Sequence, residues 1–308
     1  MKFEEILGNN KIKKDLEISA QNETTAHSYL FIGPDGIGKK LIAENFARMI
    51  LCQEHGEKKG CGTCSSCIKF DSSNNPDFFE IEPDGNSLKI AQIREMLENI
   101  YQKPIVSDKK VFIINDSEKM TQEAQNSLLK TLEEPPEYVV IIMITSNENM
   151  LLNTVKSRCV KLNFQGLTKQ EMNEYISQSG NESFSRMSDT LLEMCNGSIG
   201  KLIKVSNNID EYNQVEKATN NLLNGGVKNS VDMFNNYSVL YDSKEIIMEL
   251  LDYMMTIIFS YINRTGDSRM GVLNSVQLIE KTKRKLKKTK RIKFRDERIS
   301  FICYNRCS

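Results

Sequence analysis

Apolar residues along the first half of the chain follow two alternating patterns. Short apolar runs, with the length and composition of buried strands, recur at 29–32, 78–81, 111–114, 139–145 and 160–164. Between them, apolar residues three and four apart predict amphipathic helices at 41–51, 90–100 and 121–134. Because strands and helices alternate, the sequence predicts an α/β domain with a five-stranded parallel sheet and helices on both faces.

The pattern changes after residue 166. Helical spacing continues without a convincing apolar β run, and glycines interrupt it. We therefore expect an α/β domain and two all-α domains, at 1–165, 166–206 and 207–308. The most apolar later stretch, 246–261, contains Glu249 and Asp252, which favour a buried helix over a membrane span.

A glycine-rich loop follows the first apolar run and precedes the first helix. Gly33, Gly36 and Gly38 allow backbone N–H groups to converge on phosphate oxygens, and Lys39 would neutralise the phosphates. The next position usually supplies a hydroxyl to Mg²⁺, but this chain has Lys40. We expect a nucleotide-binding fold with weakened Mg²⁺–nucleotide binding and no hydrolysis. The alternative is a loop kept only for its shape.

The end of the third apolar run supports the same expectation. In phosphate-binding loop proteins this position presents an acid to Mg²⁺, followed by an acid that activates water. The chain has Asn115 and Asp116 there, an amide and a shorter acid. A second part of the hydrolytic apparatus is therefore impaired, which makes ATP binding doubtful and ATP hydrolysis unexpected.

Four of the eight cysteines lie within 16 residues, at Cys52, Cys61, Cys64 and Cys67. The N-terminus has no apolar signal-peptide core, so disulfides are disfavoured and a metal site explains the clustering better. Two tight C-x₂-C steps suit tetrahedral Zn²⁺, and a closed four-sulfur site has a structural role. His55 is a minor alternative ligand.

Composition is that of a soluble globular protein, with 39% apolar and 27% charged residues in 308. Net charge is zero, but residues 281–298 carry eleven Lys or Arg against two acids. Such a run either attracts a phosphate backbone or forms a solvated helix face or frayed tail. The tail at 299–308 gives no interpretable pattern. A cytoplasmic location is expected.

Several stretches together resemble one known family. In chain order they are HSYLFIGPDGIGKK at 27–40, the four-cysteine insert at about 52–67, PDFFEIEPDG at 76–85, NSLLKTLEEPP at 126–136 and SRC at 157–159. They resemble the delta-prime family of bacterial DNA polymerase III clamp-loader subunits, within the AAA+ superfamily. The resemblance covers about residues 1–205, and the remainder only by length and helical character.

The resemblance implies a role for Arg158, which lies between Ser157 and Cys159. In clamp loaders the arginine of this motif reaches into a neighbouring subunit's ATP site, so Arg158 is expected to act in trans as an arginine finger. The same resemblance assigns the four cysteines to a zinc module.

Three positions depart from the motor subunits of the same complex. Those subunits carry Thr after the loop lysine, an acidic pair at the end of the third strand, and an arginine in a glycine-serine motif of the second domain. This chain has Lys40, Asn115–Asp116 and Gly200 there. The departures imply a subunit that assists its neighbours' hydrolysis without catalysis of its own.

The expected role is that of a non-hydrolysing (stator) subunit of the polymerase holoenzyme, with a helical lid and a collar domain. Implied partners are gamma/tau-type motor subunits, the delta subunit, the sliding clamp and primed DNA. Two alternatives remain open. An active AAA+ motor would turn over ATP, against which Lys40 and Asn115 argue. A zinc-dependent DNA-binding module would use the run at 281–298, but the cysteine insert has no basic or aromatic recognition helix beside it.

Overall fold

The chain folds into two compact units. The computed structural model describes residues 3–223, 244–265, 276–277, 279–284 and 286. One unit comprises Met1–Gln178 with Gly197–Gly200, and the other Ser179–Asn196 with Lys201–Ser308. Most of the basic run at 281–298, and all of the tail at 299–308, lie outside the described residues. The division into three domains stays a prediction.

A five-stranded sheet forms the centre of the first unit. Its strands are β1 (Ser28–Ile32), β2 (Phe78–Ile81), β3 (Lys110–Ile114), β4 (Val139–Thr145) and β5 (Val160–Asn163). They are parallel throughout, in the spatial order β2-β3-β4-β1-β5. The predicted five-stranded parallel sheet is confirmed.

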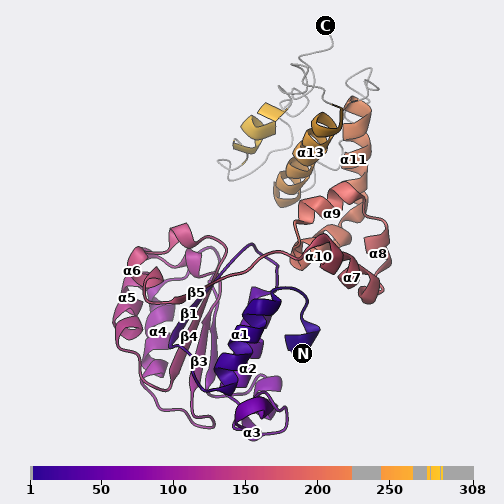
Figure 1. The fold of residues 1–308 in the computed structure, drawn as a ribbon. Helices are drawn as coiled ribbons and strands as arrows, with labels where there is room; N and C mark the ends of the chain where they lie inside the picture. Colours follow the sequence, from indigo (N-terminus) through magenta and orange to yellow (C-terminus); the bar gives the residue numbers. More distant parts are fainter. Residues whose placement is uncertain (1–2, 224–243, 266–275, 278, 285, 287–308) are drawn as a thin grey trace. The chain divides into compact units, whose positions relative to one another are not determined.

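Helices cover both faces of this sheet. Those of the first unit are α1 (Asn10–Gln21), α2 (Lys39–Ile50), α3 (Ser65–Asp71), α4 (Ile90–Ile100), α5 (Gln122–Glu133), α6 (Asn153–Lys156) and most of α7 (Lys169–Ser179). Short 3₁₀ helices are η1 (Phe3–Glu5), η2 (Gly56–Lys58), η3 (Ser117–Lys119) and η4 (Glu148–Met150). Helices α1 and α2 lie on one face, and α4, α5 and α6 on the other (Figure 1).

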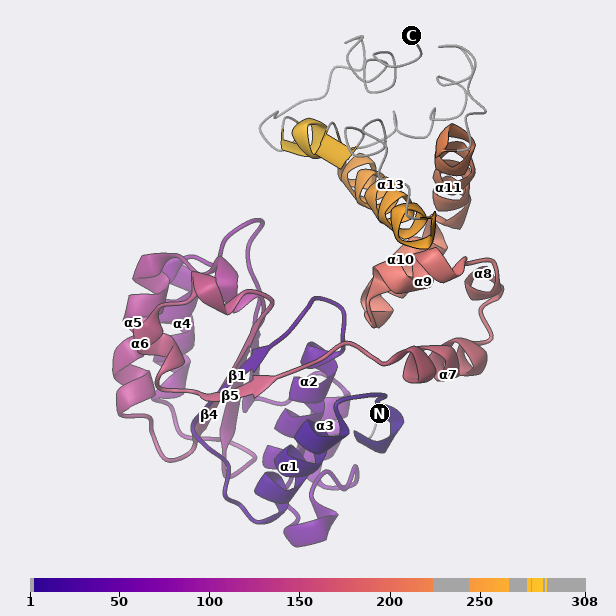
Figure 2. The ribbon, with the colours of Figure 1, turned by 45° about the horizontal axis from the view of Figure 1, so that its top comes forward.

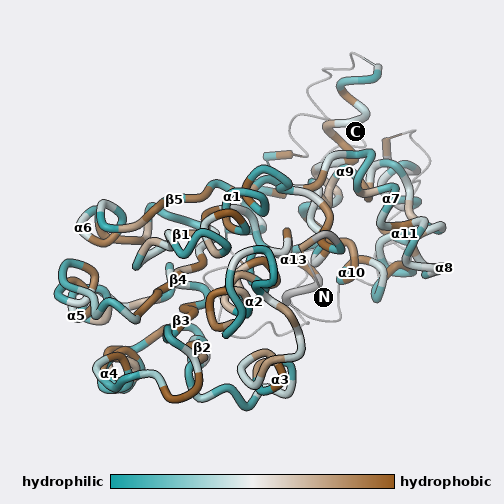
Figure 3. The backbone as a smooth tube through the Cα atoms, turned by 60° about the horizontal axis from the view of Figure 1, so that its bottom comes forward, coloured by the Kyte–Doolittle hydropathy of each residue, from teal (hydrophilic) through white to brown (hydrophobic). Residues whose placement is uncertain are grey.

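Alternating side chains of the strands divide the core between the two faces. Phe31 and Ile142 pack with α1 and α2, whereas Leu30 and Ile141 pack with α4 and α5. The strands are correspondingly brown along most of their length in Figure 3, and the helices mix brown with teal. All seven residues of β4 are buried, but β5 is an edge strand and mostly exposed. The sheet therefore leaves one edge open beside β5.

The second unit is helical in its described part. Its helices are α8 (Glu182–Ser185), α9 (Asp189–Cys195), most of α10 (Ile199–Asn207), α11 (Ile209–Leu223) and α13 (Lys244–Thr265), of which α9, α10, α11 and α13 are seen together in Figure 2. Tyr253 of α13 is fully buried, and its hydroxyl donates to Glu216 of α11. Ser188, which caps α9, donates to the same carboxylate at 2.8 Å. This partly buried set of hydrogen bonds joins three helices. None of the described helices is long and apolar enough to cross a membrane.

Candidate functional site

The glycine loop joins the carboxyl end of β1 to the start of α2. Gly36 and Gly38 have φ values of 74° and 90°, a left-handed backbone that favours glycine. A cavity of about 550 Å³ opens beside the loop, and its walls include Lys39, Lys40 and Asn115. This volume lies in the range of small-molecule sites. The structure thus brings the predicted loop residues and the end of β3 together around one cavity.

Lys39 is turned back onto the loop itself. Its Nζ donates to the carbonyl oxygens of Gly33 at 2.6 Å and Pro34 at 2.7 Å. The residue is 5% exposed, and this burial lowers its pKa, with Asp35 acting in the opposite direction. The cation that a phosphate would need is therefore already bound by backbone oxygens.

Lys40 is also paired within the chain. Its Nζ forms ion pairs with Glu80 and Glu82 at the end of β2, the latter at 2.8 Å, and lies 4.0 Å from Glu44. Partial burial lowers the pKa of Lys40, but the hydrogen bonds to Glu80 and Glu82 outweigh it and hold the pKa above its ordinary value. Lys40 thus remains a cation, at the position where a Mg²⁺ ligand would be expected.

Charge around the cavity is negative on balance. Three lysines at 39, 40 and 119 face six acids at 35, 44, 80, 82, 116 and 118, when the two partners of Lys40 are included with the lining residues. Carboxylates of Asp35, Asp116 and Glu118 lie within 4.8 Å of one another. A polyphosphate entering the cavity would meet this excess of like charge, which opposes binding.

A short segment of the first unit covers the loop from outside. Ser198 Oγ donates to the carbonyl of Asp35 at 2.8 Å, and the N–H of Gly200 donates to the carbonyl of Gly36 at 2.9 Å. A Cβ at Gly200 would lie 2.7 Å from Gly36 Cα, which no real structure accommodates without a shift. Position 200 therefore has no room for a side chain in this arrangement.

The four cysteines meet at the other end of α2. All four Sγ atoms lie within 4.8 Å of one another, with Cys52 Sγ 3.7 Å from Cys61 Sγ and 3.9 Å from Cys64 Sγ. Tetrahedral Zn²⁺ with bonds of about 2.3 Å requires sulfur atoms about 3.8 Å apart. The residues therefore fit a zinc ion. His55 instead pairs with Glu23 at 2.7 Å, so the structure does not bring it into the cluster.

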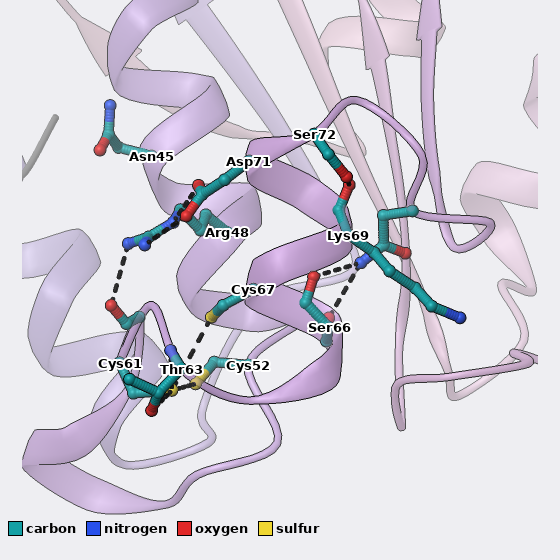
Figure 4. A network of polar contacts seen from close by, with 12 residues as sticks. Asn45, Arg48, Cys52, Cys61, Thr63, Ser66, Cys67, Lys69, Asp71 and Ser72 are labelled. Atoms are coloured by element: carbon teal, nitrogen blue, oxygen red, sulfur yellow. Dashed lines mark hydrogen bonds and ion pairs between the residues drawn. The ribbon is translucent and has the colours of Figure 1, made fainter.

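Backbone N–H groups donate to the cluster, and Arg48 joins the elements beside it through Asp71 and a loop carbonyl (Figure 4). The N–H groups of Thr63 and Cys64 donate to Cys61 Sγ at 3.4 and 3.3 Å. Burial raises the pKa of Cys61, but these hydrogen bonds and that of the Thr63 hydroxyl outweigh it and lower the pKa to about 6. Arg48 forms a two-pronged ion pair with Asp71 and donates to the Gly60 carbonyl at 2.9 Å. The thiolate form that a metal requires is thus favoured at Cys61, whereas burial raises the pKa of the Cys67 thiol. Arg48 ties α2, α3 and the loop between them together.

Asp77 was missed by sequence reasoning. It is fully buried, and its carboxylate accepts three backbone N–H bonds, from Ile105, Val106 and Ser107, at 2.7 to 2.8 Å. Ser107 Oγ in turn lies 2.9 Å from Ser66 Oγ of α3. Asp77 therefore anchors the loop beside the cysteine cluster. The only local signal is an acid directly before a strand, which does not reveal partners 28 to 30 residues away.

Arg158 lies at the opposite end of β1 from the glycine loop. Its carbonyl accepts a hydrogen bond from Ser28, the first residue of β1, whereas Gly33 follows the last. Five residues of β1 span about 16 Å, more than an extended arginine side chain covers. The guanidinium donates to the Thr154 carbonyl at 2.8 Å and forms an ion pair with Glu133. Arg158 therefore has no access to the glycine loop of its own chain.

Cys159 anchors the backbone beside Arg158. Its side chain packs against the core on the α4 and α5 face. Burial raises the pKa of the Cys159 thiol to about 11, with Ser28 and Lys161 acting in the opposite direction. The thiol is therefore a protonated packing group at neutral pH.

Comparison with known proteins gives consistent matches. A family model described as "DNA polymerase III, delta subunit" matches residues 8–168. DNA polymerase III subunit delta' of Bacillus subtilis is 34% identical over 202 residues, which are 66% of this chain and 60% of that one. DNA polymerase III subunit tau/gamma of Haemophilus influenzae is 32% identical over 175 residues, 57% of this chain and 25% of that one. The matches thus span less than two thirds of these relatives.

One solved structure has the same fold. It is a DNA polymerase III gamma subunit-related protein from Thermotoga maritima, with a TM-score of 0.50 and 17% identity over 95% of each chain. At this identity the likeness concerns the fold alone.

Proposed function

This chain belongs to the delta-prime family of DNA polymerase III clamp-loader subunits, and on that premise we propose that it is a non-hydrolysing (stator) subunit that supplies Arg158 to a neighbouring subunit's ATP site. The observation that carries the proposal is the placement of Arg158. It lies at the end of β1 remote from the chain's own glycine loop and beside the open edge strand β5. A guanidinium there can meet a nucleotide only if another chain holds it.

The glycine loop supports the non-hydrolysing part of the proposal. Lys39 is bound to loop carbonyls, Lys40 to carboxylates, and the position of the motor arginine is Gly200, packed on Gly36. Asn115 supplies no charge for a metal ion. These features weaken nucleotide binding and remove the hydrolytic apparatus, although the cavity is large enough for a small molecule.

An arginine supplied in trans acts by electrostatics. In phosphoryl transfer, negative charge spreads over the transferred group, and an arginine finger that meets it is worth about 10³- to 10⁵-fold in rate. Arg158 can provide this because its side chain is 32% exposed and arginine carries a planar, positively charged guanidinium. The partner is a gamma/tau-type motor subunit, a class to which relatives of this chain belong by name.

The remaining parts of the proposal follow from the family. The four cysteines would hold a structural zinc ion, which would supply cross-linking of α2 to α3 and no chemistry. The helical regions would serve as lid and as collar, where the chain meets the motor subunits and the delta subunit. Through the complex, the chain would act on the sliding clamp and primed DNA, as a cytoplasmic component of the polymerase holoenzyme.

The decisive experiment is Arg158→Ala in a reconstituted clamp loader in which only the ATP site beside this chain remains competent. DNA-stimulated ATP turnover should fall by about 10³-fold or more. Arg94→Ala, an exposed arginine on α4, is the matched control and should turn over ATP normally. Wild-type turnover with Arg158→Ala would refute the proposed role.

The alternatives make different predictions. A motor subunit would release phosphate as an isolated chain, and the self-bound lysines of the loop argue against this. A DNA-binding module would show salt-dependent binding that is lost when residues 281–298 are neutralised. Most of that run lies outside the described residues, and no contact of the described part favours this function.

A further inference from the structure

Helix α5 ends in an arrangement that is unfavourable for the helix. Its last residue is Glu133, followed by Glu134, so two carboxylates stand at the negative end of the helix dipole. Lys130 is the basic residue in this last turn. A carboxylate in this position needs a nearby cation or a role that outweighs its cost.

The cation near Glu133 is Arg158. One guanidinium nitrogen, Nη2, donates to Glu133 Oε1, and the other, Nη1, donates to the Thr154 carbonyl at 2.8 Å and to Ser157 Oγ at 3.4 Å. Thr154 belongs to α6, so the guanidinium bridges the ends of two helices. The side chain is thereby fixed in one direction at the start of β5.

These contacts use only part of the guanidinium. Three of its five N–H groups are donated, which leaves the Nε–H and one N–H of Nη2 without a hydrogen-bond partner among the described residues. Neighbouring N–H groups of this kind bind two oxygens of one phosphate. The arrangement therefore orients the arginine and still leaves donors available to a ligand.

Stability alone explains this ion pair poorly. Glu133 is 50% exposed and Arg158 32% exposed, and ion pairs of such exposure contribute little to folding. Orientation is a different matter, because an arginine held in its working direction loses less conformational freedom when it meets the transition state. The benefit of the pair would then appear in the reaction rate.

We propose that Glu133 is a positioning residue that holds Arg158 in the direction required by the neighbouring ATP site. This inference rests on the proposed function of Arg158. Glu133 touches neither nucleotide nor metal and acts only through the guanidinium.

The test is a double-mutant cycle in the same reconstituted complex, with Glu133→Gln, Arg158→Ala and the double variant. Glu133→Gln should lower kcat for DNA-stimulated ATP hydrolysis by about tenfold, with the KM for ATP unchanged, because the lost orientation matters only in the transition state. In the Arg158→Ala background, Glu133→Gln should cause no further loss. Glu134→Gln removes the adjacent carboxylate and should leave kcat at the wild-type value.

Each contrary result has a distinct meaning. A normal kcat for Glu133→Gln, or a further loss in the Arg158→Ala background, would overturn the positioning role while leaving Arg158 as the finger. Full activity of Arg158→Ala would overturn the proposed function and this inference together. Thermal unfolding and size-exclusion chromatography of the complex exclude misfolding, and Glu133→Asp, which keeps the charge, should recover part of kcat.

Discussion

The cationic side chains at the two ends of strand β1 differ in how they are bound within the chain. At the carboxyl end, Lys39 and Lys40 are bound by oxygens of their own chain, and the segment containing Gly200 packs on the loop. At the amino end, Arg158 is held by three contacts but keeps donors available. A phosphate-binding shape can thus persist while its charged groups are satisfied internally.

The largest expected effect separates these two ends directly. In the complex with a single competent site, Arg158→Ala should lower ATP turnover by about 10³-fold or more, because the charge of the transition state loses its cation. Lys39→Ala should leave turnover unchanged, since its partners are Gly33 and Pro34 of the same loop. Steady-state ATPase rates measure both. Equal losses would show that the loop end also takes part in hydrolysis.

A second prediction concerns the packing of Gly200 on Gly36. Gly200→Ala introduces a Cβ 2.7 Å from Gly36 Cα and should lower the free energy of unfolding by about 1–3 kcal/mol. Denaturant unfolding of the full chain measures this. Lys201→Ala, at the next position of α10, should change stability by no more than about 0.5 kcal/mol. An unaffected Gly200→Ala protein would show that the loop is not covered in solution.

The four cysteine sulfurs are a third case, because they lie close together and would be held there by a zinc ion. The pKa of Cys61 is lowered from 9.0 to about 6. The Cys61 thiolate therefore contributes fully to the stability of the folded chain above pH 9, and this contribution is lost as the pH falls through about 6. Zinc affinity should therefore fall by about fivefold between pH 6 and pH 5 from protonation of the Cys61 thiol alone. A zinc-sensitive dye monitors the release.

A matched variant tests the ligand set. His55→Ala should release zinc at the same pH as the wild-type chain, because His55 pairs with Glu23 outside the cluster. Zinc release by His55→Ala at neutral pH would contradict the four-cysteine site.

The last variant, Lys40→Thr, should leave ATP hydrolysis by the isolated chain unchanged. Lys40→Thr restores the hydroxyl of the phosphate-binding pattern but leaves Asn115, the bound Lys39 and the covering Gly200 in place. Phosphate release by the isolated variant should remain at background. Turnover like that of a motor subunit would show that Lys40 alone disables the loop.

Sequence reasoning identified local patterns and missed long-range partners. The strands, the glycine loop and the four cysteines each lie within a short stretch, so spacing was sufficient to predict them. Lys40 pairs with Glu82, which is 42 residues away in sequence. Ser198 donates to a carbonyl 163 residues away, and Arg158 pairs with a carboxylate 25 residues away. Such pairs depend on the order of strands in the sheet, which no local pattern contains.

Residue type alone did not reveal which polar groups pair with one another. Lys39 fits a phosphate ligand by position, but two of its three ammonium N–H groups already donate to Gly33 and Pro34. The motif gives no sign of this pairing with the loop carbonyls. Asp77 has no motif, although three backbone N–H groups depend on it.

The placement of Arg158 and the glycine loop at opposite ends of β1 gives the chain a polarity. Under the proposed function, such a subunit supplies an arginine to one neighbour's ATP site and needs no arginine at its own glycine loop. Head-to-tail contacts between related subunits generate rings or open arcs, and every member must both donate and receive for the row to continue. Under the proposed function, a subunit that supplies an arginine but needs none would stand at the end of such an assembly. Its geometry would then fix where the assembly ends on that side.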